Sequence, residues 1–263
     1  MAIVSTGATS IWMTASRSGL AAFALMLMVI SFGHLRRPSR LDLPALMAIG
    51  ILQLTIFFLF CHFAVQFVPA GHTAILSNAA IIWVVPLAAI SRHREPIGRW
   101  FAAALTLVGV AIVIEPWSIS PADVSTVWGY ASLLAAAFAW ACTIIVTKAY
   151  PPKLQVIELL PWAFGLSAAL LVILALVLEP SGGIPLAALP LAVFNGFVVA
   201  PFGTCCIIEL SRRLTPTAAA ICFMIIPVVG ILISTLMLNE AISLGLIIGG
   251  AMIVVGAAFT SFR

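Results

Sequence analysis

Apolar residues dominate nine stretches of this chain, and short polar segments separate them. Each stretch approaches or exceeds the roughly 20 residues that a helix needs to cross a bilayer. The expected helices cover residues 8–33, 43–66, 69–91, 97–115, 127–150, 155–178, 187–210, 214–238 and 241–261. The hydropathy pattern therefore predicts an all-α polytopic membrane protein.

The amino-acid composition supports the same class. Hydrophobic residues make up 63% of the chain and charged residues only 8%, whereas a soluble domain carries about 25% charged residues. A soluble fold of 263 residues could not cover so much apolar surface. We therefore expect a multi-pass protein of the cell (inner) membrane, surrounded by the lipid bilayer.

Basic residues mark one side of the predicted membrane. Apart from Arg17, all of them lie in or beside alternate loops: Arg36, Arg37, Arg40, Arg92, Arg94, Arg99, Lys148, Lys153, Arg212, Arg213 and Arg263. The other loops hold only acidic charges, at Glu115, Asp123, Glu179 and Glu240. Because basic loops stay in the cytoplasm, we expect the C-terminus and residues 36–40, 92–99 and 212–213 inside, and 116–126 and 180–186 outside. The net charge of +4 is spread over loops, so no nucleic-acid partner is expected.

The chain contains an internal repeat. A shift that places Pro69 on Pro216 also aligns, without a gap, Gly98 with Gly245, Val108 with Val255, Gly109 with Gly256 and Ala111 with Ala258. The shift aligns the third helix with the eighth, which comes five helices later. Because successive helices cross the membrane in alternate directions, helices that are an odd number apart run in opposite directions. We therefore expect two inverted-topology helix bundles, 1–122 with four helices and 123–263 with five, an architecture that recurs in secondary transporters.

The two predicted repeats differ by one helix. The fifth helix would align with positions before residue 4. We expect that the first helix of a ten-helix protein is absent from this sequence, through a late start codon or a truncated gene model. A true nine-helix variant is the alternative.

The stretch from Leu214 to Gly256 carries the most specific pattern. Two apolar runs flank a hinge at Asn239 and Glu240, with Pro227 before it and Gly249 and Gly256 after it. This pattern resembles the end of an EamA-type domain of the drug/metabolite transporter superfamily. The first repeat departs from it, with His93 in place of the Glu and Ala80 in place of the Pro. Loss of that Pro predicts a third helix straighter than the eighth.

The resemblance implies a function. It implies a secondary transporter of small metabolites or drug-like molecules, with export as the expected direction and alternating access as the mechanism. Two alternatives stay open: an inactive truncated fragment and a membrane-embedded enzyme. The enzyme is disfavoured because no H-E-x-x-H, G-x-S-x-G or paired Asp-rich loop is present.

Cysteine spacing argues against metal chemistry. The five cysteines, Cys61, Cys142, Cys205, Cys206 and Cys222, all lie within apolar runs, and none has a C-x-x-C spacing. We interpret them as small packing residues. No catalytic residue, metal or cofactor is expected.

Arg17 is a basic residue within the first predicted helix. One interpretation is an interfacial Arg near the outer end of the helix, whose stem reaches the headgroups. The other is contact with substrate or a helix end, because a charge inside a membrane segment is costly and marks function by default.

We expect the pathway between the two halves, lined by the second, third, fifth, seventh and eighth helices. With Arg17, the predicted set is His62, Asn78, Trp83, Trp140, Asn195 and Thr204. Asn78 and Trp83 would lie about 140° apart on one helix, whereas His62 has a second interpretation, exposure to water at the outer end. For both indoles, the alternative to a cavity is a dry core in which each N–H bonds a carbonyl. The seventh helix should break between Asn195 and Thr204, where Gly and Pro interrupt it.

Two further features have structural interpretations. Glu158 and Glu209 lie near basic loop residues, so we expect ion pairing rather than proton transfer. The G-x-x-x-G of Gly245 and Gly249 predicts close helix packing within the chain, with a homodimer interface as the second interpretation.

Overall fold

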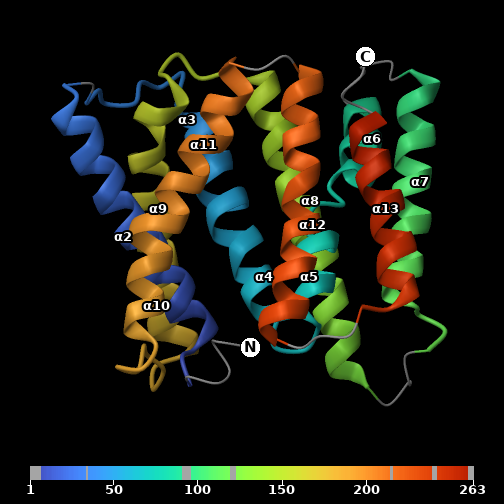
Figure 1. Cartoon of the computed structure of the whole chain (residues 1–263). Coiled ribbons are helices and arrows are strands. Elements are labelled where there is room, and N and C mark those ends of the chain that lie inside the picture. The colour runs from blue at the N-terminus through green and yellow to red at the C-terminus, as the bar shows by residue number, and fades with distance from the viewer. Residues whose placement is uncertain are drawn as a thin grey trace. The chain divides into compact units, whose positions relative to one another are not determined.

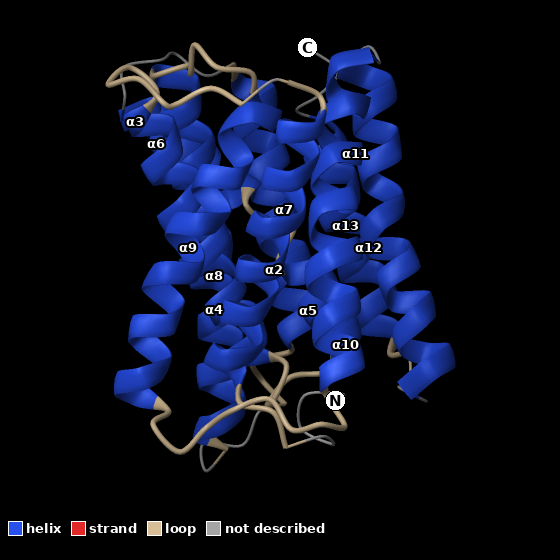
Figure 2. Ribbon diagram, turned by 90° about the vertical axis from the view of Figure 1, so that its left-hand side faces the viewer, coloured by secondary structure: helices blue, strands red, loops and turns tan. Residues whose placement is uncertain are grey.

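The computed structural model describes residues 7–33, 35–90, 96–118, 123–213, 216–238 and 242–259. Every element in these ranges is a helix (Figure 2). Seven helical spans there are long and apolar enough to cross a membrane, and two further helices have shorter apolar stretches with described side chains, Ile225–Met237 and Leu244–Ala258. The predicted all-helical membrane fold is confirmed. His93 and Glu240 lie outside the described residues, as do the side chains of Glu209 and Cys222.

Each predicted helix has a counterpart in these ranges (Figure 1). The uninterrupted helices are α2 (Ser10–Ser31), α7 (Ile97–Ile114), α8 (Val124–Ala149), α9 (Val156–Leu178), α12 (Pro216–Leu238) and α13 (Leu244–Phe259). The second span consists of α3 (Leu43–Met47), the π-helix η1 (Ala48–Phe57) and α4 (Phe58–Ala64). The third consists of α5 (Ala70–Leu76) and α6 (Ile81–Ile90), and the seventh of α10 (Leu189–Phe194), the π-helix η2 (Asn195–Val199) and α11 (Ala200–Arg213).

The third span is interrupted, so the prediction that it is straighter than the eighth is wrong. The side-chain amide of Asn78 donates to the carbonyl of Ala74, at 2.8 Å. That carbonyl is the usual acceptor for the Asn78 backbone N–H, which bonds Ile75 instead. In contrast, α12 continues through Pro227. Asn78 therefore interrupts the third span, although that span has Ala80 where the eighth has Pro227.

Helix starts recur along the chain with the predicted shift, to within one residue. The paired elements begin at Ser10 and Val156, Leu43 and Leu189, Ala48 and Asn195, Ala70 and Pro216, and Ile97 and Leu244. The two π-helices thus begin at equivalent positions of the two copies. This agreement supports the internal repeat, while the boundary between residues 122 and 123 stays a prediction.

The equivalent helices α2 and α9 pack side by side and run in opposite directions (Figure 1). At the start of α2, the N–H of Ile11 donates to the Glu179 carboxylate, which follows the end of α9. Beyond the other end of α2, Arg36 pairs with Glu158 at the start of α9, with 4.0 Å between Nε and Oε1. Opposite directions are what inverted repeats require, and the predicted ion pairing of Glu158 is confirmed.

The chain folds into two compact units. The first unit combines Met1–His62 with Val146–Arg212, and the second combines Phe63–Ile145 with Arg213–Arg263. Each unit therefore takes helices from both predicted repeats. The compact units and the repeats are different divisions of the chain.

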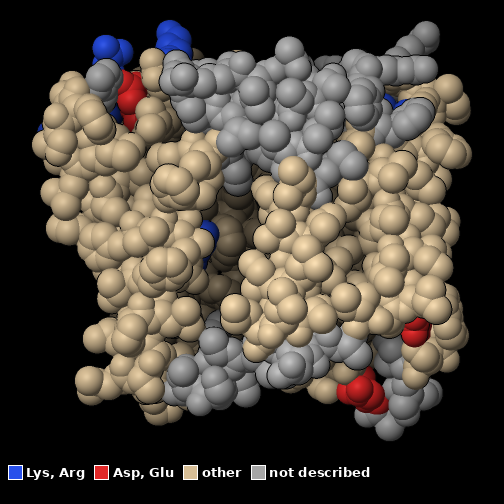
Figure 3. Space-filling model, in the orientation of Figure 1, with Lys and Arg blue, Asp and Glu red and all other residues tan. Residues whose placement is uncertain are grey.

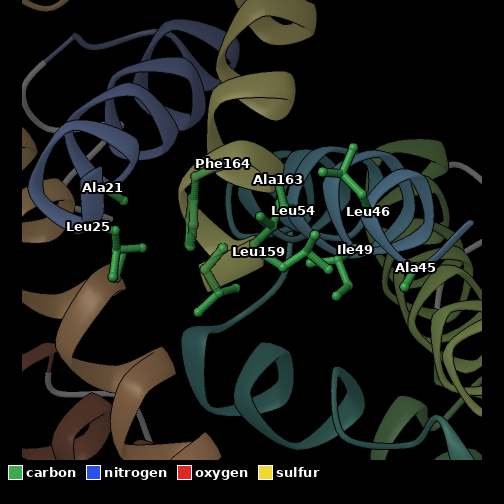
Figure 4. Close-up of a cluster of buried hydrophobic side chains, with 11 residues drawn as sticks. Ala21, Leu25, Ala45, Leu46, Ile49, Leu54, Leu159, Ala163 and Phe164 are labelled. Carbon is green, nitrogen blue, oxygen red and sulfur yellow. The ribbon is translucent and has the colours of Figure 1, made fainter. Parts of the chain in front are cut away.

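The core of the first unit lies where α2, η1 and α9 meet. Its buried residues are Ala21, Leu25, Ala45, Leu46, Ile49, Leu54, Leu159, Leu160, Ala163, Phe164 and Ala200, most of which are labelled in Figure 4. Phe164 is fully buried and lies among alanine and leucine side chains. Small residues bring the helix backbones close, and large ones fill the remaining space.

The second unit contains a glycine-lined contact between α7 and α13. A Cβ on Gly249 would lie 2.5 Å from the carbonyl oxygen of Gly109, and one on Gly109 would lie 2.6 Å from that of Gly249. Gly245 lies against Ile112 and Gly256 against Ala102, so these two helices are also antiparallel. The G-x-x-x-G of α13 therefore packs within the chain. A homodimer stays a prediction.

Candidate functional site

Arg17 is buried within the first unit. It is the eighth residue of α2, about 10 Å from the start of that helix, and only 8% of its surface is exposed. Its guanidinium carbon lies 3.6 Å from the centroid of the Phe58 ring. Nη1 is buried and has no hydrogen-bond partner. The prediction that Arg17 extends to the headgroups is therefore wrong, because its charged end lies on an aromatic ring inside the protein.

The energetics show what Phe58 contributes. An Arg near the centre of a membrane helix costs at least about 2.5 kcal/mol. A desolvated cation–π contact contributes about 2 kcal/mol. The ring therefore offsets much of the cost of burying the charge of Arg17, but it supplies no hydrogen-bond acceptor to Nη1.

The local structure of the second span places this ring. Phe58 is the first residue of α4, directly after the π-helical segment η1. A π-helix has a wider turn than an α-helix, so it rotates the residues that follow it. Within η1, the hydroxyl of Thr55 donates to the carbonyl of Gly50, five residues earlier, at 2.8 Å. Such segments are frequent at functional sites.

His62 and Thr14 lie beside Arg17 along the same two helices. Thr14 is fully buried, and its hydroxyl donates to the Ser10 carbonyl at 2.7 Å. The Thr14 hydroxyl also bonds Nδ1 of His62. Which of the two atoms donates depends on the tautomer of the imidazole. His62 is therefore held against α2, and the interpretation that it simply faces water is wrong.

The acidic side chains described in the first unit are all held at helix ends. Glu179 accepts the backbone N–H groups of Ile11 and Trp12. Glu158 forms a capping box with Gln155 and pairs with Arg36. The third is Asp42. None of the three is paired with Arg17.

Asp42 links two loops, and sequence reasoning missed it. The hydroxyl of Ser39 donates to its carboxylate at 2.6 Å, and the N–H groups of Lys153 and Leu154 donate at 2.7 and 3.0 Å. These hydrogen bonds, the one from the Ser39 side chain above all, lower the pKa of Asp42 to about 2. The only sign of this role in the sequence is that Asp42 is an acidic residue in a basic loop and directly precedes an apolar run.

A buried polar network stabilises the same unit. The hydroxyls of Thr55 and Ser167 are hydrogen-bonded at 3.0 Å, and those of Ser18 and Ser167 lie 3.2 Å apart. Ser18 and Ser167 have no exposed surface. This network connects α2, η1 and α9 by hydrogen bonds across helices, which is the usual role of hydroxyl groups in membrane helices.

At the predicted break the seventh span stays helical and changes to the π-helical turns of η2, which starts at Asn195. A Cβ on Gly196 would lie 2.5 Å from the Cβ of Leu20, so glycine lets η2 approach α2. Leu20 lies one turn beyond Arg17 on α2. Asn195 is half-buried, and Thr204 bonds the carbonyl of Ala200, four residues earlier, at 2.7 Å. The first unit thus places His62 and the η2 segment beside the part of α2 that carries Arg17.

The other three predicted residues lie in the second unit. Trp83 meets Phe138 edge to face, with 5.4 Å between ring centroids. Its Nε1 is buried and has no hydrogen-bond partner among the described residues, so the alternative of a carbonyl partner finds no support for this indole. The predicted angle between Asn78 and Trp83 does not apply, because the helix breaks between them. Trp140 is half-buried on α8, about 200° around that helix from Phe138.

Trp83 also lines a cavity of about 460 Å³. The lining is almost entirely apolar and consists of Ile82, Trp83, Pro86, Trp100, Ala103, Ala104, Leu107, Val110 and Leu134. Trp100, Ala104 and Leu107 are exposed on the surface of the spans. The cavity suits an apolar group.

Comparisons with known proteins agree with this architecture. Among curated proteins, none matches the chain. Seven chains of solved structures match. One, described only as "Crystal structure of protein", is 21% identical and has a TM-score of 0.65, covering 100% of this chain and 92% of that chain. At this identity it shows the fold alone.

The family assignment comes from the sequence. The model of the EamA-like transporter family matches residues 1–115 and 127–262, which is nearly the whole chain in two successive segments. These proteins are membrane transporters of the drug/metabolite transporter superfamily. The chain belongs to the EamA-like transporter family.

Proposed function

We propose that this protein is a secondary transporter that exports small metabolites or drug-like molecules across the cell (inner) membrane by alternating access. The observation that carries the proposal is the pair of π-helical segments. η1 and η2 begin at Ala48 and Asn195, equivalent positions of the two repeats, and both belong to the first unit. Interrupted helices at corresponding positions of two inverted repeats are typical of transporter binding sites.

The chemistry of such interruptions explains why they suit transport. A π-helical turn alters the regular backbone hydrogen bonding, and irregular backbone at membrane depth is tolerated only inside protein or beside an aqueous cavity. Near these segments the first unit places Arg17, His62 and Asn195. Polar groups of this kind at membrane depth mark substrate pathways. Asn78, Trp83, Trp140 and Thr204 stay proposed contacts further along the pathway.

The orientation rests on the loop charges. Loops 35–42 and 150–155 lie at the same end of the first unit, because Asp42 accepts the N–H groups of Lys153 and Leu154. This end carries the basic residues Arg36, Arg37 and Arg40. Charged side chains on the visible face gather mostly at helix ends (Figure 3). We assign the basic ends, and with them the C-terminus, to the cytoplasm.

Counterflow in proteoliposomes tests the function. The purified chain is reconstituted and loaded with unlabelled amino acids, nucleosides, monocarboxylates or cationic drugs. Uptake of the matching labelled compound is then measured. We expect protein-dependent counterflow with at least one class. If no class gives counterflow above protein-free vesicles, the proposal is wrong.

A further inference from the structure

We propose that Arg17 binds the anionic group of the transported molecule and that this group is a single carboxylate. The inference rests on the proposed transport function and adds a substrate class to it. It starts from a charge that the described residues of the first unit do not balance. The acids described there, Asp42, Glu158 and Glu179, are each hydrogen-bonded at a helix end.

The stacking geometry leaves the hydrogen-bonding edge of the guanidinium for a ligand. Phe58 covers one face of the group at 3.6 Å. The five N–H donors of Arg lie in the guanidinium plane, so a ring on the face does not use them. Nη1 is buried and bonds no acceptor. A carboxylate fits this edge with two parallel hydrogen bonds, which a Lys ammonium could not reproduce.

Charge balance selects the kind of anion. Arg17 is buried, in a segment that the bilayer surrounds. One carboxylate neutralises its single charge, whereas a phosphate dianion would leave a buried negative charge. Phe58 lies against the guanidinium and Leu20 one turn along α2, whereas the nearby Thr14 and His62 are neutral polar groups already hydrogen-bonded to each other. The site therefore favours a monocarboxylate with an apolar body.

The neighbouring elements give the site a means of access. Nη1 is closed off from solvent in this structure, so a ligand must enter after a local rearrangement. The segments beside Arg17 are η1, which leads into Phe58, and η2, which approaches α2 through Gly196. Both are π-helical, and such segments are frequent at functional sites.

Thermal unfolding of the purified full chain in detergent tests the carboxylate site. The probes are acetate, butyrate, benzoate and indole-3-acetate, each paired with its neutral amide, together with inorganic phosphate. We expect at least one monocarboxylate to raise the midpoint, while its amide and phosphate do not. Arg17→Gln should abolish the shift, Arg17→Lys should reduce it, and Arg37→Gln should keep it. Arg37 is the matched control because it lies exposed in a loop.

Three results would overturn the inference: no shift with any carboxylate, an equal shift with the amide, or a shift that persists in Arg17→Gln. A structural role for Arg17 predicts a lower midpoint for Arg17→Gln without ligand, whereas a ligand-binding role predicts an equal or higher one. Counterflow separates this failure from failure of the function. If wild type and Arg17→Gln transport neutral or cationic probes equally well, the protein is a transporter but Arg17 is not an anion site. If none of the probes gives counterflow, the proposed transport function itself is wrong.

Discussion

Arg17 and Phe58 form a buried cation–π contact, with 3.6 Å between the guanidinium carbon and the ring centroid. The contact joins α2 to the segment that follows η1. It places a charge that no described acid of the first unit balances beside the π-helical part of that unit. The first prediction concerns the strength of this contact.

A double-mutant cycle should show strong coupling between these two residues. We expect Phe58→Leu to destabilise the wild type by about 1–2 kcal/mol more than it destabilises Arg17→Gln, because only the wild type loses the ring under a desolvated cation. Chemical unfolding of the four proteins in detergent measures the difference. Additive effects of the two substitutions would mean that the ring does not stabilise the charge.

Substitution of the glycines between α7 and α13 should destabilise the second unit. A methyl group at Gly249 would lie 2.5 Å from the Gly109 carbonyl oxygen, which is backbone and cannot rotate away. We expect Gly249→Ala to cost about 1–3 kcal/mol, as overpacking does elsewhere. Gly165→Ala is the control, because a Cβ there meets no atom within 4 Å. Equal unfolding midpoints for the two variants would contradict the close contact.

Acid should remove the stabilising effect of Asp42. Its pKa of about 2 in the folded protein lies below the usual value of 3.8, so its stabilisation is present above about pH 4 and is lost as the pH falls toward 2. We expect Asp42→Asn to lower the unfolding midpoint at pH 7, and the difference from wild type to shrink between pH 4 and pH 2. A difference that does not change with pH would show that the hydrogen bonds do not depend on the carboxylate charge.

Impermeant maleimide labelling should report the orientation. On a cysteine-free background, we expect Ser181→Cys to react in intact cells and Pro38→Cys to react only after permeabilisation. The reason is that residue 38 lies in a basic loop and residue 181 follows Glu179 in a loop without basic residues. Labelling of residue 38 in intact cells would reverse the assignment.

The sequence predicted the helices far better than their interruptions. Apolar length is a local property, so all nine helices were recognisable from hydropathy. An interruption at Asn195 was predicted because glycine and proline follow it. The break at Asn78 was missed because it depends on a hydrogen bond from the Asn78 side-chain amide to the carbonyl of Ala74. The π-helix η1 was also missed, since its residues are mostly ordinary apolar ones.

The candidate site was only partly predictable for a similar reason. A basic residue in an apolar run identifies Arg17 as unusual, and an intramembrane polar residue identifies His62 and Asn195. Their neighbours depend on tertiary packing: Phe58 reaches Arg17 through the register of η1, and Leu20 meets Gly196 through the approach of η2. Nothing local distinguishes Phe58 from the other aromatic residues around it.

Accessibility of residue 195 from both sides of the membrane is the most direct test of alternating access along the interrupted span. Asn195→Cys on a cysteine-free background is treated with an impermeant, thiolate-reactive reagent in intact cells and in inverted vesicles. The control is Phe194→Cys, because Phe194 is 56% exposed on the outer surface of its span, where lipid keeps a thiol protonated. We predict that residue 195 reacts from each side in turn and that residue 194 reacts from neither. Reaction of residue 195 from one side only, or from neither, would contradict the proposal.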